Sequence, residues 1–455
     1  MKSFRPNLPW AELYVRSGLK TLSDRVRQRP IVRRVRGAVD ELRTTVRDAA
    51  RQRLPVVAEH IIRQVFTKHD CDLLSCINAT GVIAPRGLTL PLPDAALAAM
   101  ASVSESYSIP SPAAETLLAE LANAEAAIVL HSPAVAAIAV LQALGGRTVV
   151  ARDQIGELDG VPLASLAQSA DIELTEIGSV GRVSRDDYRD ALTLGKNGCL
   201  WYSRPQTIAL TGDLAIPPAD EVFALARDRR YPVVECLEAA TLIDISSMSS
   251  EGPAIPLVSA SLSAGADLVI FPGDRFVGGP HCGIVVGKSE LVTCVAKHPF
   301  ARVSVIDSAR LAALVATLQL IGKPNGPSLV PTLQLLIASA ENLKHRAERL
   351  AAQIRECATV AAAEAVSSPG FLQDGRLSCQ EIAGWSVAII PVDVSPEEMA
   401  EKLRNAQPSI LASVEAGRVQ INLRSVLARQ DAQVTAAFQG GNREILPLQG
   451  GVQSA

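Results

Sequence analysis

The sequence predicts an α/β protein whose largest part is a mainly parallel sheet of seven strands. Seven strand patterns follow one another in the middle of the chain, and two of them, 267–271 and 282–286, are short apolar runs rich in β-branched residues and bounded by Gly or Pro. Helical patterns at 133–144 and 218–229 fall between them, as crossover connections of a parallel sheet require. The expected strands are 126–130, 148–151, 172–177, 199–202, 233–236, 267–271 and 282–286.

The chain on either side of this core predicts two further parts. Residues 8–66 carry apolar side chains at helical spacing, so we expect a helical module over residues 1–70. After a helical stretch at 308–320, helical patterns at 342–356 and 396–404 alternate with strand patterns at 385–390, 410–414 and 418–423. We therefore expect a basic helical module at 1–70, a large α/β domain at 71–305, and a linker helix with a small α+β domain at 306–455.

Charge is spread unevenly along the chain. The net charge is -3, but residues 1–70 hold sixteen Lys and Arg against seven Asp and Glu, a net of +9 that leaves -12 for the remainder. Arginines that neutralise phosphates would make this module a nucleic-acid contact. A solvated basic face, or a face that docks on the acidic body of a neighbouring subunit, explains the same pattern.

Hydropathy and cysteine spacing indicate the compartment. No run of about 18 apolar residues predicts a membrane span, and the N-terminus lacks the apolar segment of a signal peptide. The eight cysteines are scattered without a C-x-x-C pair, so neither a disulfide framework nor a metal site is expected. We expect a reduced, cytoplasmic protein.

Three motifs carry a resemblance to a known family. They are INATGV at 77–82, PGDRFVGGP at 272–280, and GRVQINLRSVL at 417–427. They resemble bacterial selenocysteine synthase, the L-seryl-tRNA(Sec) selenium transferase, a pyridoxal-phosphate (PLP) enzyme of fold type I. The resemblance implies an aspartate aminotransferase-like large domain, PLP as cofactor, tRNA contacts from the N-terminal module, and a homo-oligomer, either a dimer or a ring of dimers.

The resemblance also assigns positions in the cofactor site. The family lysine that forms the imine with PLP aligns with Arg275, which follows Asp274. The aspartate that pairs with the pyridine nitrogen aligns with Cys236, and the family reads Glu-Asp-Leu-Gly where this chain has Glu-Cys-Leu-Glu at 235–238. The remaining aligned positions are His131, Ser132 and Ala134 at the helix start that holds the cofactor phosphate, and Gly278 and Gly279 in the turn. For His131 and Ser132 a plain helix cap is the alternative.

These substitutions change the chemistry. A guanidinium stays protonated and offers only donors, so Arg275 cannot form an imine, although it can hold a phosphate or carboxylate. A protonated thiol at Cys236 cannot supply the charge that keeps PLP an electron sink. The family's His-Thr-Asn-x-Gly motif is replaced by APRGL at 84–88, and its basic pocket segment by a short stretch at 104–115. We therefore expect no covalently bound PLP.

Three functions remain open. The first is a degenerate family member that binds tRNA, an active family member, or an anionic ligand at Arg275. The second is a working selenium transferase that converts seryl-tRNA(Sec) to selenocysteinyl-tRNA(Sec). The third is a PLP-independent enzyme that uses His281 and Cys282, for which ordinary packing is the alternative.

Overall fold

The computed structural model describes residues 75–109, 111–179, 181–193, 197–203, 216–248, 253–373 and 381–439. The basic helical module that the sequence predicts at 1–70 lies outside these residues and stays a prediction.

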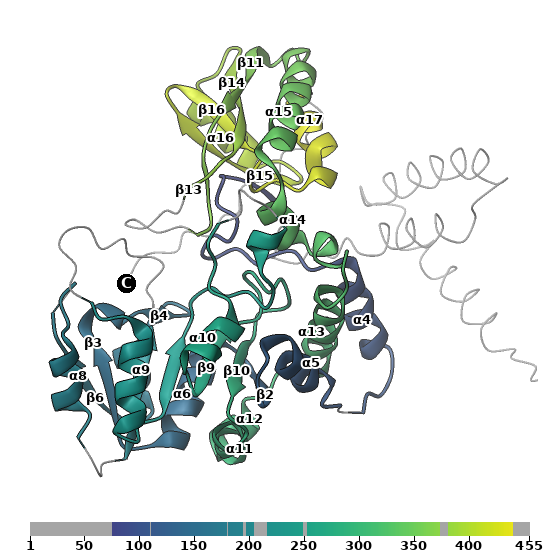
Figure 1. The fold of residues 1–455 in the computed structure, drawn as a ribbon. Helices are drawn as coiled ribbons and strands as arrows, with labels where there is room; N and C mark the ends of the chain where they lie inside the picture. Colours follow the sequence, from purple (N-terminus) through teal and green to yellow (C-terminus); the bar gives the residue numbers. More distant parts are fainter. Residues whose placement is uncertain are drawn as a thin grey trace, which may run out of the picture. The chain divides into compact units, whose positions relative to one another are not determined.

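A seven-stranded sheet forms the centre of the large domain (Figure 1). Its spatial order is β2-β10-β9-β8-β7-β3-β6, and the neighbours from β9 through β6 are parallel. Only β10 runs antiparallel, to both β2 and β9. The predicted mainly parallel sheet is confirmed, with every strand end within one residue of its expected place. The bounds are β2 Ala126–Leu130, β3 Arg147–Ala151, β6 Glu173–Ile177, β7 Gly198–Ser203, β8 Val233–Cys236, β9 Leu268–Pro272 and β10 Gly283–Gly287.

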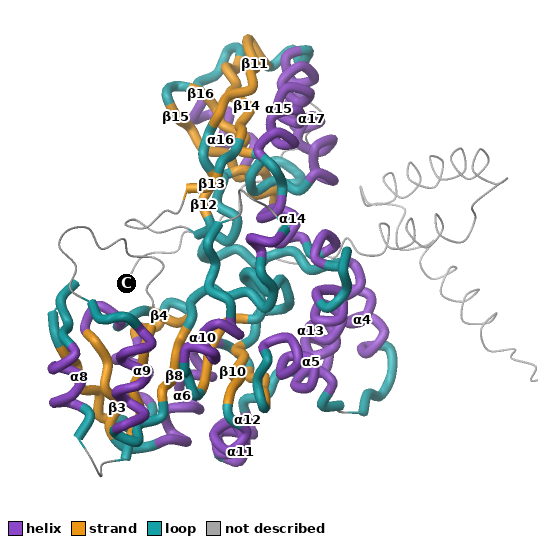
Figure 2. Tube along the Cα trace, viewed as in Figure 1, coloured by secondary structure: helices purple, strands orange, loops and turns teal. Residues whose placement is uncertain are grey.

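Helices bury both faces of this sheet (Figure 2). Adjacent strand residues such as Val149 and Val150 belong to different core clusters, because successive side chains of a strand point to opposite faces. Coverage of both faces explains why central strands such as β9 and β10 are continuous apolar runs, whereas the edge strand β6 has the sequence ELTEI. The helices are α4 Asp94–Ser104, α5 Ala113–Ala122, α6 Pro133–Leu144, α7 Leu163–Ser169, α8 Arg185–Ala191, α9 Ala219–Asp228, α10 Val258–Ala264, α11 Ser289–Lys297, α12 Pro299–Val303 and α13 Ser308–Ile321.

The second sheet has five strands in the order β1-β15-β16-β14-β11. Its first strand, β1 (Cys76–Ala79), comes from the INATGV motif and pairs in parallel with β15. The segment that we expected to open the large domain thus extends the sheet of the small one. The other strands are β11 Val360–Ser367, β14 Trp385–Pro391, β15 Ser409–Glu415 and β16 Arg418–Asn422, and the helices are α14 Pro331–Ile337, α15 Ala340–Arg355, α16 Pro396–Arg404 and α17 Asp431–Phe438.

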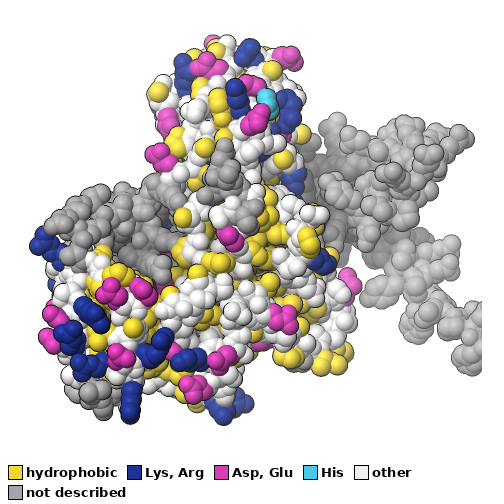
Figure 3. All heavy atoms as spheres, in the orientation of Figure 1, with side chains coloured by type: hydrophobic (Ala, Val, Ile, Leu, Met, Phe, Trp, Pro, Cys, Tyr) yellow, Lys and Arg dark blue, Asp and Glu magenta, His cyan; other side chains and the backbone are white. Residues whose placement is uncertain are grey.

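Two short antiparallel strand pairs accompany the sheets: β4 (Glu157–Leu158) with β5 (Val161–Pro162), which form a hairpin, and β12 (Gly370–Phe371) with β13 (Glu381–Ile382). No helix of the described residues is long and apolar enough to cross a membrane. On the face shown in Figure 3, basic and acidic side chains are interspersed over α8 and α9. That mixture differs from the single-sign surface that favours nucleic acid.

Candidate ligand-binding site

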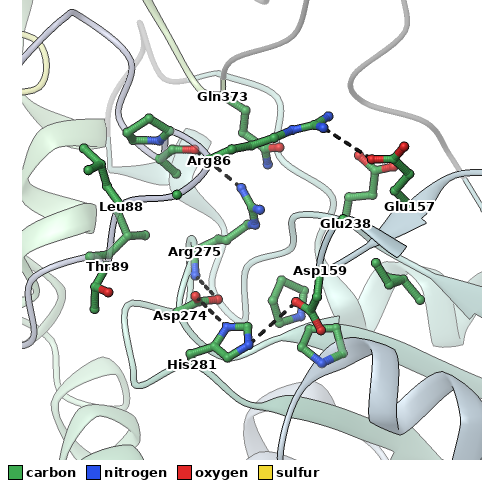
Figure 4. Close-up of a pocket in the computed structure, with 18 residues that line it drawn as sticks. Arg86, Leu88, Thr89, Glu157, Asp159, Glu238, Asp274, Arg275, His281 and Gln373 are labelled. Atoms are coloured by element: carbon green, nitrogen blue, oxygen red, sulfur yellow. Dashed lines mark hydrogen bonds and ion pairs between the residues drawn. The ribbon is translucent and has the colours of Figure 1, made fainter. Parts of the chain in front are cut away.

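A cavity of about 470 Å³ lies where β8 and β9 end, the edge at which open α/β sheets bind ligands. Six segments supply its walls (Figure 4): the loop after β1, the start of α6, the β4–β5 turn, the loop after β8, the β9–β10 turn, and Gln373 in the segment after β12. Its charged and polar lining comprises Arg86, Thr89, Glu157, Asp159, Glu238, Asp274, Arg275, His281 and Gln373.

The β9–β10 turn brings Asp274 and Arg275 into this cavity together. Backbone bonds from Gly278 to Asp274 and from Gly279 to Gly273, both 2.9 Å, fold the turn. The guanidinium of Arg275 extends to the loop that follows β1, where its Nη1 donates to the carbonyl of Ala84 at 3.4 Å (Figure 4). A planar guanidinium has five donors, so this one long bond leaves it able to bind a ligand oxygen.

Two carboxylates face opposite sides of the His281 ring. Its Nδ1 is 3.0 Å from Asp274 Oδ2, and its Nε2 is 3.6 Å from Asp159 Oδ1 (Figure 4). The hydrogen bond with Asp274 raises the pKa of His281 above its usual value, against the opposing effects of burial and of Arg310. Burial by itself would raise the pKa of Asp274, but the bond from His281 and the nearby positive charges hold it below its usual value. The pair is therefore stable as imidazolium and carboxylate.

The start of α6 is capped from two directions. The Oγ of Ser132 accepts a bond from the amide of Val135 at 3.4 Å, which is the plain cap left open by the sequence. The Oδ2 of Asp159 accepts a bond from the amide of Ala134 at 2.9 Å. His131 is exposed and takes no part in this cap; its Nδ1 accepts a bond from Arg310 at 2.9 Å.

Three other positions expected in the cofactor site lie outside the cavity lining. Cys236 is 2% exposed within β8, and burial, together with the negative charges of Glu238, Glu235 and Asp159, raises the pKa of its thiol. Gly278 and Gly279 are buried behind the turn. A Cβ on Gly278 would lie 2.3 Å from Val330 Cγ1, so this position serves a close approach of two segments.

His281 and Cys282 do not form a catalytic pair. His281 lines the cavity, whereas Cys282 is fully buried in the core, and burial raises the pKa of its thiol. The packing interpretation of Cys282 therefore holds. The sequence offered no partner for His281, and the structure supplies two.

Asp159, Glu238 and Arg310 are site residues that sequence reasoning did not select. Asp159 carried a usable signal, because Asp-Gly between two short extended segments is typical of a two-residue β-hairpin turn. Glu238 was visible as an acidic residue in place of the family glycine. Nothing local indicated Arg310, which reaches His131 and the carbonyl of His281 from the first turn of α13.

The side chains at this site do not fit PLP. The α6 amide of Ala134 is bound to Asp159 and is closed to a phosphate, and at the positions that the resemblance assigns to the pyridine partner and the imine lysine the chain has the buried thiol of Cys236 and the guanidinium of Arg275. Among the described lysines, at 288, 297, 323, 344 and 402, none lines the cavity. The described residues also hold no cluster of His, Cys, Asp or Glu suited to a metal ion.

Sequence comparison finds one family across most of the chain. The family profile described as L-seryl-tRNA selenium transferase matches residues 110–427. The L-seryl-tRNA(Sec) selenium transferase of Geobacter sulfurreducens is 30% identical, over 89% of this chain and 92% of that protein. The protein of the same name from Hyphomonas neptunium is 28% identical, over 93% of this chain and 95% of that protein.

Structure comparison supports the fold. D-Glucosaminate-6-phosphate ammonia-lyase superposes with a TM-score of 0.57 at 17% identity, over 83% of this chain and 97% of that chain. The architecture is that of PLP fold type I, as the sequence predicts.

Proposed function

The chain belongs to the L-seryl-tRNA selenium transferase family, and we propose that it is a member that binds ligands without forming an imine with PLP. It has the PLP fold type I architecture and a cavity at the edge of the sheet, and it uses Arg275 to hold a small anionic group. One observation carries this proposal: the cavity is present, and Arg275 lines it at the position where the resemblance implies the reactive lysine.

Arginine favours binding over covalent chemistry at this position. An imine needs a neutral amine with a free lone pair, which lysine can supply and a guanidinium cannot. The fork of Arg275 instead suits the two oxygens of a carboxylate. Asp159, Glu238 and Asp274 line the same cavity, so a ligand that also offers a positively charged or hydrogen-bond-donating group gains a second set of contacts.

A reduction experiment tests the proposal. Purified full-length protein is mixed with PLP, treated with borohydride, and examined by absorbance and by mass spectrometry of its peptides. We expect no stoichiometric PLP adduct on any lysine of the chain, while the Geobacter sulfurreducens relative, treated in parallel, serves as the comparison. A stoichiometric adduct on one lysine of this chain would overturn the proposal.

A working selenium transferase is the second candidate. The names of the relatives and their coverage of about nine tenths of this chain favour it. It requires a lysine from outside the described residues to reach the cavity. Formation of selenocysteinyl-tRNA(Sec) by the purified wild-type chain would select it over the first proposal.

The partners follow from the same proposal. Residues 1–70, with their net charge of +9, are the proposed contact with tRNA, the class of molecule on which the relatives' names say they act. We also propose a homo-oligomer, a dimer or a ring of dimers, in the cytoplasm. Light scattering of the purified protein at micromolar concentration checks the assembly, and a monomer would contradict it.

A further inference from the structure

The β4–β5 hairpin places a carboxylate at the start of α6. Its two turn residues, Asp159 and Gly160, have φ of 54° and 77°. Both are left-handed, as a type I′ turn requires, and Asp is one of the few residues besides Gly that tolerates this region. The hairpin itself needs only the backbone conformation, so the direction of the Asp159 side chain can serve another purpose.

Both oxygens of Asp159 have partners at the cavity wall. Oδ2 accepts the amide of Ala134 at 2.9 Å, and Oδ1 lies 3.6 Å from Nε2 of His281. The amides of the first helical turn have no partner within the helix and point outward, which makes a helix N-terminus an anion site. In this chain the anion at the twelve-residue helix α6 is a side chain of the protein.

The surroundings leave little room for a second anion. Strand β10 passes so close to the start of α6 that a Cβ on Gly283 would lie 2.2 Å from the carbonyl oxygen of Ser132. On the cavity side lie the carboxylate of Glu238 and that of Asp274, which already binds His281. A phosphate that approached the amide of Ala134 would have to displace Asp159 and then lie beside these carboxylates.

We infer that Asp159 is a specificity-determining residue: its carboxylate fills the anion site at the start of α6 and excludes phosphate-bearing ligands from the cavity. The inference rests on the proposed function, because it concerns which ligands that cavity admits. It restricts the anionic ligand of Arg275 to groups that carry no phosphate.

Titration of the full-length protein with inorganic phosphate in a calorimeter tests this inference. Asp159→Gly removes the carboxylate at a position where glycine suits the backbone. We expect this variant to bind phosphate at least tenfold more tightly than the wild type. Asp159→Asn keeps the size and the tolerance of positive φ but removes the charge, so its affinity should fall between the two.

Asp171→Gly is the matched control. Asp171 has φ of 55° but is exposed in the turn between α7 and β6, away from the cavity lining, so phosphate affinity should stay at the wild-type value. Phosphate held by the arginines of residues 1–70 would appear equally in every variant. Affinities that agree within twofold for the wild type and both Asp159 variants would overturn the inference. If Asp159→Gly fails to fold, the comparison with Asp159→Asn decides.

The outcome is separate from that of the proposed function. Borohydride trapping of PLP on a wild-type lysine would defeat the proposed function. A phosphate affinity that the Asp159 substitutions leave unchanged would defeat only the inference about specificity.

Discussion

Replacing His281 by Gln should weaken the folded state in a pH-dependent way. The side chains of His281 and Asp274 are 44% and 23% exposed, and the variant leaves the Asp274 carboxylate without its imidazolium partner. A hydrogen bond between charged groups contributes about 1.5–3 kcal/mol, and solvent screening at this half-exposed pair reduces it to about 1 kcal/mol. For a chain of this length, the midpoint of thermal unfolding should fall by about 1–2 °C near pH 5.5.

The two pKa shifts determine how the stabilisation by the His281–Asp274 pair changes with pH. Since the pKa of His281 is raised, its contribution is complete below the unfolded value of about 6.5 and is lost as the pH rises through the folded value. Since the pKa of Asp274 is lowered, its contribution is present above about pH 3.9 and is lost as the pH falls through the folded value. The pair therefore stabilises most between about pH 4 and pH 6.5, and the difference between wild type and variant should shrink by pH 9.

The assay is thermal unfolding by circular dichroism from pH 4 to pH 9 at one heating rate. His345→Gln is the control, because His345 lies on the surface of α15 with Glu341 and Glu348 and is 68% exposed. It should show a smaller pH dependence. An equal loss for His281→Gln at pH 5.5 and pH 9 would refute the reasoning, because the effect would then be packing and not charge.

Three further predictions concern chemistry, packing and RNA. Arg275→Lys should yield no selenocysteinyl-tRNA(Sec), because the anion site and the pyridine partner remain changed; product formation by this single variant would contradict it. Gly278→Ala should lower the free energy of unfolding by about 2–4 kcal/mol in urea titrations, since its Cβ would overlap a neighbouring valine, whereas Gly417→Ala, with φ of 70° and nothing within 4 Å, should cost about 1 kcal/mol. Binding of tRNA should weaken with salt by a log–log slope of about -0.7 to -0.9 per phosphate contacted, and equal binding by a chain lacking residues 1–70 would show that these residues are not the contact.

The sequence predicted most helices and strands because the apolar runs, turns and helix caps that define them lie within a few neighbouring residues. Central strands of the large sheet such as β9 and β10 are apolar on both faces and end at turns, so their limits could be read directly. The start of α16 was equally clear: Ser395 and Glu398 form a capping box around Pro396, the first residue of the helix.

Two elements of the small domain needed tertiary information. Strand β11 has the sequence VAAAEAVS, whose alanines favour a helix, and it is extended because it pairs with β14 along its length. Strand β1 entered the sequence analysis only through the INATGV motif, and its partner β15 lies more than 300 residues away in the sequence. A local pattern can predict a strand without predicting the sheet to which it belongs.

The site divides in the same way. Arg275 and Asp274 were selected by alignment with a motif, and both line the cavity. Asp159 depends on where the β4–β5 hairpin packs against α6, and Arg310 on where α13 begins relative to β2. The residues adjacent to Asp159 and Arg310 in the sequence do not determine either of these packing arrangements.

At Cys236, where the resemblance implies an aspartate, the departures from the family act together. An aspartate restored at this position would be almost fully buried and would face the same negative charges that already contribute to the raised pKa of the thiol, from Glu238, Glu235 and Asp159. Burial and like charges raise the pKa of a carboxylic acid as well, so that aspartate would tend to hold its proton and would offer no charge to a pyridine nitrogen. The acidic surroundings, to which Glu238 and Asp159 both contribute, thus oppose PLP chemistry even where the family residue is put back.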